Sequence, residues 1–161
     1  PYVTTKYPEK KIAIVSCMDT RLTELLLAAL GLKNGDVKLI KNAGGVVMSP
    51  FDSTIRSLLV GIYELDVREI MIVGHTDCGA QHLDSEEIIK KMLDRGISRD
   101  RINMMKYCGI NFEQWLCGFN SLEKAVSESV QLVANHPLIP ADVKVRGFVI
   151  DSVTGKLAEI L

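Results

Sequence analysis

The sequence predicts an α/β fold, in which helices flank a mainly parallel β-sheet of order 2-1-3-4 with an antiparallel edge strand. Short apolar runs that suit buried strands alternate along the chain with stretches whose apolar residues recur at helical spacing. Such alternation is typical of strands that pair in parallel through helical crossovers. We expect a single domain over residues 1–161, because this length suits one hydrophobic core and no linker or repeat interrupts it.

The first half of the chain carries the predicted parallel strands. They are expected at 11–17 (KIAIVSC), 36–42 (DVKLIKN) and 68–75 (REIMIVGH). The third run is nearly continuous in apolar residues, as a strand covered on both faces should be. A helix is predicted over 21–31, closed by Gly31. A second helix is predicted over 49–65, with Ser49 as its cap and Pro50 in its first turn.

The second half contains two clear helices and a terminal hairpin. Amphipathic spacing predicts helices over 85–96 and 121–137, whereas 98–119 reads as short helices mixed with turns. Residues 143–161 are expected to form two strands about a Thr-Gly turn at the edge of the sheet.

The charge balance and the cysteine content argue against several classes of protein. The chain has 19 basic and 20 acidic residues without a basic cluster, so neither a nucleic acid nor an anionic membrane surface is an expected partner. No apolar stretch is long enough to span a bilayer, and no signal peptide is recognisable. The four cysteines form no C-x-x-C pair and are too sparse for a disulfide scaffold. A cytoplasmic location is therefore expected.

Three potential metal ligands follow two of the predicted strands. Cys17 ends the first strand, His75 ends the third, and Cys78 lies in the turn after it. Ligands of open parallel sheets bind beyond the carboxyl ends of the strands, where the strand order reverses. Two cysteines and one histidine are a ligand set that zinc accepts, and no fourth ligand is evident. The pattern predicts an open zinc site, as a catalytic ion requires.

An acid and an arginine lie beside the first ligand, at Asp19 and Arg21. Two thiolates cancel the charge of Zn²⁺, so the ion acidifies water less than a cationic site would. An ionised carboxylate can accept a hydrogen bond from the bound water and orient it. Arg21 can hold Asp19 in a bidentate pair that lowers its pKa and fixes its direction.

These motifs occur in an order that resembles the β-class carbonic anhydrases. C-x-D-x-R follows one strand and H-x-x-C another, with KNAGG, IRSL and GFVIDSVTGKL elsewhere, so that the likeness covers most of the chain and is greatest to the short microbial branch. The resemblance implies a zinc lyase with one zinc ion per chain, whose zinc-bound hydroxide reversibly converts CO₂ to bicarbonate and a proton. It also implies a homodimer or a dimer of dimers. Asn42, Gly44 and Gly45 would line the substrate cleft.

Three other functions are compatible with parts of this pattern. The same hydroxide could hydrolyse a related heterocumulene, CS₂ or COS. A non-catalytic zinc-binding homologue would keep the fold, but would have no use for the acid and arginine. A thiol enzyme that uses Cys17 is disfavoured, because no resolving C-x-x-C is present and CMDTR lacks the backbone donors of a phosphate-binding loop.

Several other residues that could carry chemistry are assigned structural roles. Asp77 is interpreted as a turn residue or cap, His82 as an exposed helix histidine and His136 as a cap or surface group. Cys108 and Cys117 are expected to be buried thiols. The remaining large side chains of the irregular region are interpreted as residues that pack in the core or at an interface: Met104, Met105, Phe112, Trp115 and Phe119.

Overall fold

The computed structural model describes residues 2–161 and contains a five-stranded sheet of order β2-β1-β3-β4-β5. The strands are β1 (Ile12–Cys17), β2 (Val37–Asn42), β3 (Glu69–His75), β4 (Lys144–Ile150) and β5 (Leu157–Glu159). β1 pairs in parallel with β2 and β3, β3 pairs in parallel with β4, and β5 pairs antiparallel to β4. The predicted fold class and strand order are confirmed.

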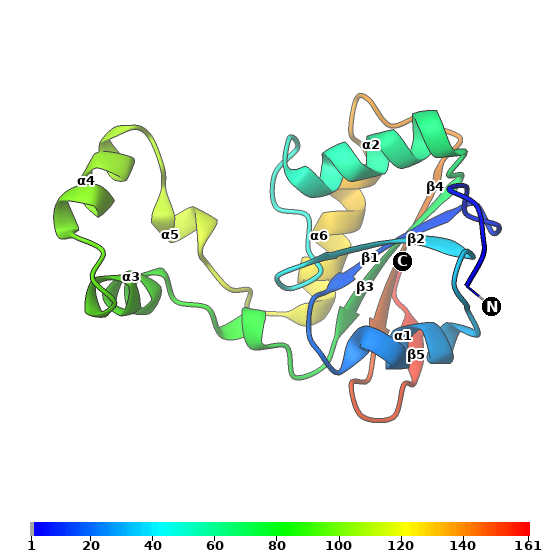
Figure 1. Ribbon diagram of the computed structural model, residues 1–161, viewed down its shortest axis with the longest axis horizontal. Helices are drawn as coiled ribbons and strands as arrows, with labels where there is room; N and C mark the ends of the chain where they lie inside the picture. The colour runs from blue at the N-terminus through cyan, green and yellow to red at the C-terminus, as the bar shows by residue number, and fades with distance from the viewer. Residues whose placement is uncertain (1) are drawn as a thin grey trace. The chain divides into compact units, whose positions relative to one another are not determined.

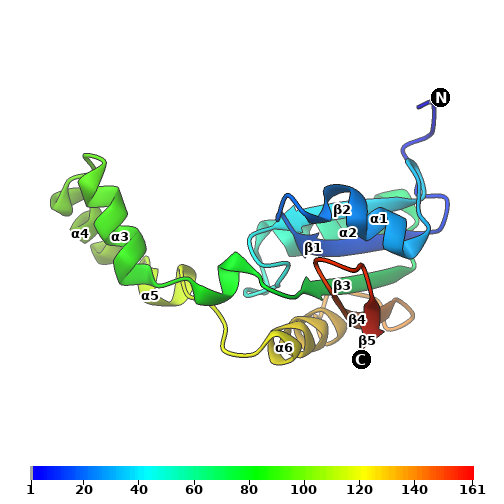
Figure 2. The ribbon, with the colours of Figure 1, turned by 90° about the horizontal axis from the view of Figure 1, so that it is seen from below.

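Three helices cover the sheet: α1 (Leu22–Leu30), α2 (Ser53–Leu65) and α6 (Leu122–Ala134). α2 and α6 share one hydrophobic core with β1 and β3, in which Leu58 and Val126 are fully buried. α1 lies on the opposite face of the sheet (Figures 1 and 2). Because both faces are covered, the central strands are apolar throughout, as their sequences suggest.

The second helix begins later than the sequence analysis predicts. α2 starts at Ser53, and the Asp52 carboxylate caps it by accepting a hydrogen bond from the Ile55 backbone N–H at 2.8 Å. Ser49 and Pro50 therefore belong to the preceding loop. The prediction was wrong because Asp52 satisfies the free N–H groups of the first turn from within the expected helix.

The chain divides into two compact units. One contains the sheet and comprises the residues up to Cys78 together with Ser121–Leu161; the other is Gly79–Asn120. The expectation of a single domain stays a prediction. The elements of the second unit are the 3₁₀ helix η1 (Gly79–His82), α3 (Ser85–Asp94), α4 (Arg99–Tyr107) and α5 (Phe112–Trp115). This arrangement agrees with the expected short helices and turns, and a small core of Ile89, Ile102 and Phe112 holds it together.

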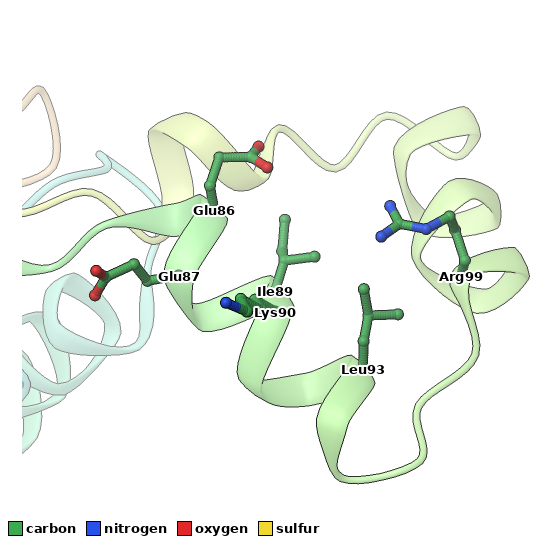
Figure 3. Close-up of a pocket in the computed structure, with 6 residues that line it drawn as sticks. All are labelled: Glu86, Glu87, Ile89, Lys90, Leu93 and Arg99. Atoms are coloured by element: carbon green, nitrogen blue, oxygen red, sulfur yellow. The ribbon is translucent and has the colours of Figure 1, made fainter.

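Several side chains of the second unit are more exposed than predicted. Cys108 is exposed and Cys117 is partly exposed, so neither is a buried thiol. Met104 and Trp115 are 61% and 66% exposed, so both lie outside the small core of this unit, and packing of these side chains at an interface stays a prediction. A pocket of about 370 Å³ is lined by the α3 residues Glu86, Glu87, Ile89, Lys90 and Leu93, with Arg99 of α4 (Figure 3). Among residues 2–161, no helix combines the length and apolar character that crossing a membrane requires.

His136 is buried, which corrects its interpretation as a cap or surface group. Its Nε2–H donates to the Pro50 carbonyl at 2.7 Å, and its Nδ1 accepts a hydrogen bond from the Leu138 N–H at 3.1 Å. The α6 cap is instead Asn135. Because both ring nitrogens bond to backbone groups, His136 stabilises the loop before α2 against the loop after α6.

Candidate metal centre

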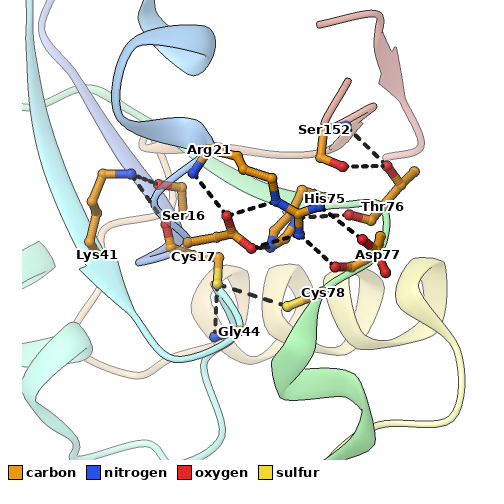
Figure 4. A network of polar contacts seen from close by, with 11 residues as sticks. Ser16, Cys17, Arg21, Lys41, Gly44, His75, Thr76, Asp77, Cys78 and Ser152 are labelled. Carbon is orange, nitrogen blue, oxygen red and sulfur yellow. Dashed lines mark hydrogen bonds and ion pairs between the residues drawn. The ribbon is translucent and has the colours of Figure 1, made fainter. Parts of the chain in front are cut away.

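The two central strands bring three ligand-bearing residues to one point. β1 and β3 are parallel neighbours, and their carboxyl ends carry Cys17 and His75, while Cys78 follows in the turn after β3. The two sulfur atoms and a ring nitrogen all lie within 4.8 Å of one another, and all three residues are buried (Figure 4). The two Sγ atoms are 3.8 Å apart, which is too long for a disulfide bond. The predicted cluster is therefore assembled by the sheet itself.

The histidine is prepared to bind a cation. Its Nδ1 lies 2.8 Å from the Thr76 carbonyl oxygen, which can only accept a hydrogen bond, so Nδ1 carries the proton. In the neutral ring this leaves a lone pair on Nε2, which is buried and has no hydrogen-bond partner among the described residues. A buried orphan acceptor is costly unless something fills the position. This nitrogen, beside two sulfurs, fits a zinc ion.

The loop after β2 contributes backbone groups to the first ligand. The Gly44 N–H donates to Cys17 Sγ at 3.4 Å, which places a hydrogen-bond donor against the sulfur. Gly45 has a φ of 65°, and a Cβ there would lie 2.7 Å from the Cys17 backbone nitrogen. Only glycine permits this approach, because both the left-handed backbone and the contact exclude a side chain. The structure therefore places both predicted loop glycines against Cys17.

The acid and the arginine form the predicted bidentate pair. Arg21 Nε donates to Asp19 Oδ1 at 3.0 Å and Arg21 Nη2 donates to Asp19 Oδ2 at 2.8 Å, while the Arg21 backbone N–H also donates to Oδ1. These hydrogen bonds, reinforced by the charge of Arg21, hold the pKa of the Asp19 carboxyl well below its usual range. Asp19 Oδ2 is 3.9 Å from His75 Nε2. An ionised carboxylate thus lies directly beside the potential ligand atoms.

Asp77 joins this network, which the sequence analysis did not anticipate. Its side-chain Oδ2 accepts from Arg21 Nη1 and its carbonyl accepts from Arg21 Nη2, both at 2.8 Å (Figure 4). The hydrogen bonds that Arg21 donates to Asp19 and Asp77 raise the pKa of Arg21 above its usual value. The only available signal was the H-x-D-C spacing, since the contact depends on a left-handed backbone at Asp77, where φ is 53°. Asp77 therefore does more than shape a turn.

Two residues, Lys41 and Thr76, anchor the chain segments around the ligands. Lys41 Nζ donates to the Cys17 carbonyl at 3.2 Å and contacts Ser16 Oγ at 3.3 Å, and desolvation lowers the Lys41 pKa. On the other side, Thr76 Oγ1 accepts from the Ser152 N–H at 3.0 Å, which ties the loop after β3 to the turn after β4. Neither residue was singled out from the sequence, because both contacts depend on the register of neighbouring strands.

Asn42 ends β2 opposite Cys17 in the strand register. Its Nδ2 donates to the Val46 carbonyl at 2.9 Å and to Thr54 Oγ1 at 3.0 Å, which closes the loop that carries Gly44. Its Oδ1 is buried and has no partner within residues 2–161. Asn42 therefore shapes this loop and retains one acceptor that nothing in the described chain satisfies.

Two features lie outside the cluster of ligands. His82 is exposed at the end of η1, as expected. The pocket in the second unit contains none of the predicted site residues, and its lining of mixed charges and two aliphatic side chains has no evident role in the chemistry.

The sequence model of the carbonic anhydrase family matches residues 12–157, which is most of the chain. The chain is a member of the β-class carbonic anhydrase family. The reaction of this family is the reversible hydration of CO₂, which makes its members lyases, and the family is zinc-dependent.

Individual relatives agree with the assignment of this carbonic anhydrase homologue. It is 51% identical, over all of its length and 82% of the relative, to a Bacillus subtilis protein named "Putative carbonic anhydrase YvdA". The crystal structure of β-carbonic anhydrase isoform I from Trichomonas vaginalis has a TM-score of 0.91 at 36% identity, covering 99% of this chain and 86% of that one. A more distant relative, carbon disulfide hydrolase from Acidithiobacillus thiooxidans, is 29% identical over 92% of this chain and 76% of its own.

Proposed function

We propose that this chain binds one Zn²⁺ through Cys17, His75 and Cys78 and uses it to hydrate CO₂ reversibly to bicarbonate and a proton. One observation carries the proposal: a buried orphan nitrogen and two sulfurs within 4.8 Å of one another lie next to a carboxylate that an arginine keeps ionised. When bound, zinc would supply Lewis-acid activation of a water molecule near neutral pH.

The protein's own groups prepare the ligands. The Thr76 carbonyl fixes the tautomer and the orientation of His75, so that the Nε2 lone pair is available without rearrangement. The Gly44 N–H donates a hydrogen bond to Cys17 Sγ and thereby helps to hold this sulfur in position. Two thiolates and a neutral imidazole balance the charge of the ion and leave no net charge to be buried.

Asp19 is the catalytic residue besides the ligands. Because Arg21 lowers its pKa, it stays ionised at neutral pH and can accept a hydrogen bond from the reacting water without taking the proton. Its Oδ2 accepts one hydrogen bond, from Arg21 Nη2, which leaves capacity for a second. Arg21 acts through Asp19 by fixing the plane of the carboxylate, so that a lone pair of the water faces the carbon of CO₂.

The substrate cleft is proposed to include Asn42, Gly44 and Gly45. Absence of side chains at the two glycines lets backbone line the approach to the metal site, and the unsatisfied Asn42 Oδ1 offers an acceptor to water. CO₂ carries no charge and no donor, so a small cleft with few polar groups suits it.

The proposal includes the oligomeric state and the cellular location of the enzyme. The family resemblance supports a homodimer or a dimer of dimers. Four cysteines without a disulfide among the described residues suit a reducing cytoplasm, and the balanced charge gives no reason to expect nucleic acid or a membrane surface as a partner.

A second candidate reaction is hydrolysis of CS₂ or COS. It is favoured by the likeness to carbon disulfide hydrolase, which is 29% identical to this chain, whereas the Bacillus subtilis protein named as a carbonic anhydrase is 51% identical. Both substrates are linear molecules of three atoms that the same activated water could attack.

Stopped-flow assays on protein of counted zinc content test the proposal. We expect rapid CO₂ hydration by the wild type, and a loss of most activity in Asp19→Asn with zinc retained. CS₂ and COS are assayed in parallel under the same conditions. Faster turnover of either gas than of CO₂ would favour the second candidate, and full activity of Asp19→Asn would remove the role given to this carboxylate.

A further inference from the structure

The two loops that carry the metal ligands are far apart in sequence, and one side chain bridges them. The first loop follows Cys17 at the end of β1, and the second follows His75 at the end of β3 and bears Cys78. Arg21 extends from the end of the first loop, and its guanidinium donates to both the side chain and the backbone carbonyl of Asp77 in the second (Figure 4). A planar group held at several points cannot rotate as a single contact would allow.

The hydrogen bonds of Arg21 are divided between two carboxylates. One edge of the guanidinium, Nε and Nη2, holds Asp19 at 3.0 and 2.8 Å. Nη1 holds Asp77 Oδ2 and the other Nη2 hydrogen reaches the Asp77 carbonyl, each at 2.8 Å. Nη2 is thus shared between the two residues, and the position of Asp77 sets the plane in which Asp19 is held.

We propose that Asp77 is a positioning residue that directs Asp19 toward the reacting water by fixing the guanidinium of Arg21. This inference rests on the proposed function. It adds Asp77, which acts through Arg21 and needs no contact with the ligand atoms. The Arg21 side chain is 41% exposed, so without a second anchor its Nη1 end faces solvent and can move. The plane of Asp19 would then no longer be fixed.

The energetics separate this role from a structural one. The Asp77 side chain is 84% exposed, and ion pairs of such exposure contribute little to folding stability. Loss of the side chain should therefore leave the fold and the zinc content unchanged. Orientation of Asp19 is more sensitive, because small displacements of a reacting group reduce rates strongly.

The backbone at Asp77 determines which variants are informative. Its φ of 53° is tolerated by aspartate, asparagine and glycine, so Asp77→Asn and Asp77→Gly keep the turn and the carbonyl contact. Asparagine retains a neutral acceptor for Nη1, whereas glycine retains none. We therefore expect the restraint on the Arg21 guanidinium to decrease from the wild type to Asp77→Asn and again to Asp77→Gly.

Asp66 provides a matched control. It also has a left-handed backbone, with φ of 57°, and an exposed carboxylate that binds the Nε of an arginine, Arg68, at 2.7 Å. It lies before β3, at the opposite end of that strand from His75. Asp66→Gly therefore makes the same chemical and backbone change outside the site.

The test is made on zinc-loaded protein with two readouts. The first is the NMR order parameter of the Arg21 Nε–H bond, which reports motion of the guanidinium on the picosecond–nanosecond timescale. The second is kcat/KM for CO₂. In Asp77→Gly we expect the order parameter to fall and kcat/KM to drop about 3- to 10-fold with one zinc per chain retained, since a misdirected group costs this much or more. Asp77→Asn should recover part of both, and Asp66→Gly should change neither.

A double-mutant comparison shows whether Asp77 acts through Asp19. In an Asp19→Asn background, Asp77→Gly should cause no further loss of kcat/KM. An equal loss in both backgrounds would overturn the inference, as would an unchanged Arg21 order parameter in Asp77→Gly. If the wild type failed to hydrate CO₂, the proposed function would fall, and the order parameter would still decide whether Asp77 fixes Arg21.

Discussion

Replacement of Gly45 by alanine tests how closely the loop after β2 must approach the first ligand. The new Cβ would lie 2.7 Å from the Cys17 nitrogen, 3.0 Å from the Ser16 carbonyl carbon and 3.2 Å from the Val73 carbonyl oxygen. All three atoms are backbone, so none can turn aside as a side chain could. The strand end that carries Cys17 must shift, or the loop must move away from it.

The chain offers a control with the same backbone conformation. Gly31 has φ of 64°, close to the 65° of Gly45, but a Cβ there would meet no atom within 4 Å. The left-handed conformation costs alanine about 1–2 kcal/mol at both positions. Overpacking adds about 1–3 kcal/mol at Gly45 alone. We expect Gly31→Ala to lower the free energy of unfolding by about 1–2 kcal/mol and Gly45→Ala by about 2–5 kcal/mol.

Urea unfolding of both variants, at one fixed concentration of free zinc, measures this difference. Competition with a chromophoric chelator measures zinc affinity in parallel, and only Gly45→Ala should bind zinc more weakly than the wild type. If the two variants were destabilised equally, within about 0.5 kcal/mol, the contact between Gly45 and the Cys17 backbone would have no energetic role.

Three further predictions concern the network around the site and its support. Ser129→Ala should lower the free energy of unfolding by about 1–3 kcal/mol, because the buried Ser129 Oγ accepts from the Val47 N–H at 2.9 Å and its loss leaves that donor unsatisfied. Ser57→Ala is the control in urea unfolding and should be nearly neutral, because it removes only a solvent-exposed hydrogen bond to the Ser53 carbonyl. Arg21→Lys should keep zinc but reduce CO₂ hydration roughly 10- to 100-fold, since lysine keeps the charge without the bidentate contact. Activity near that of the wild type would show that the bidentate contact between Arg21 and Asp19 is not needed. The lowered pKa of Asp19 stabilises the folded state at pH values above the unfolded pKa of about 3.9, and this stabilisation is lost as the pH falls toward the folded pKa. In urea unfolding, the metal-free wild type should therefore lose more stability than metal-free Arg21→Ala between about pH 5 and pH 2. Equal losses would contradict this assignment.

The sequence allowed the fold and the metal cluster to be predicted because both depend on features that are local or topological. Apolar runs predicted the strands, and adjacent parallel strands have their carboxyl ends at the same edge of the sheet. Cys17 and His75 could therefore be placed side by side without any knowledge of loop geometry. The bidentate contact between Asp19 and Arg21 could also be predicted, since a single residue separates them and the chain leaves β1 in a tight turn.

Contacts that depend on loop conformation were out of reach. The Arg21–Asp77 contact requires a left-handed residue 56 positions away from the arginine, and no pattern in HTDCG predicts that backbone. The hydrogen bond from Gly44 to Cys17 Sγ depends in the same way on the path of the loop after β2. His136 was interpreted as a cap or surface group because it lies at the end of a predicted helix, but two backbone groups satisfy its ring in the interior.

Catalysis of CO₂ hydration should depend on a zinc ion bound by Cys17, His75 and Cys78. A metal titration measures this dependence directly. Zinc is removed from the protein with a chelator and returned in measured portions, and stopped-flow hydration is recorded at each step. We expect activity to rise linearly and to stop rising at one zinc per chain, with no comparable rise in Cys78→Ser. Activity that is independent of zinc, or that Cys78→Ser regains fully at the same stoichiometry, would contradict this expectation.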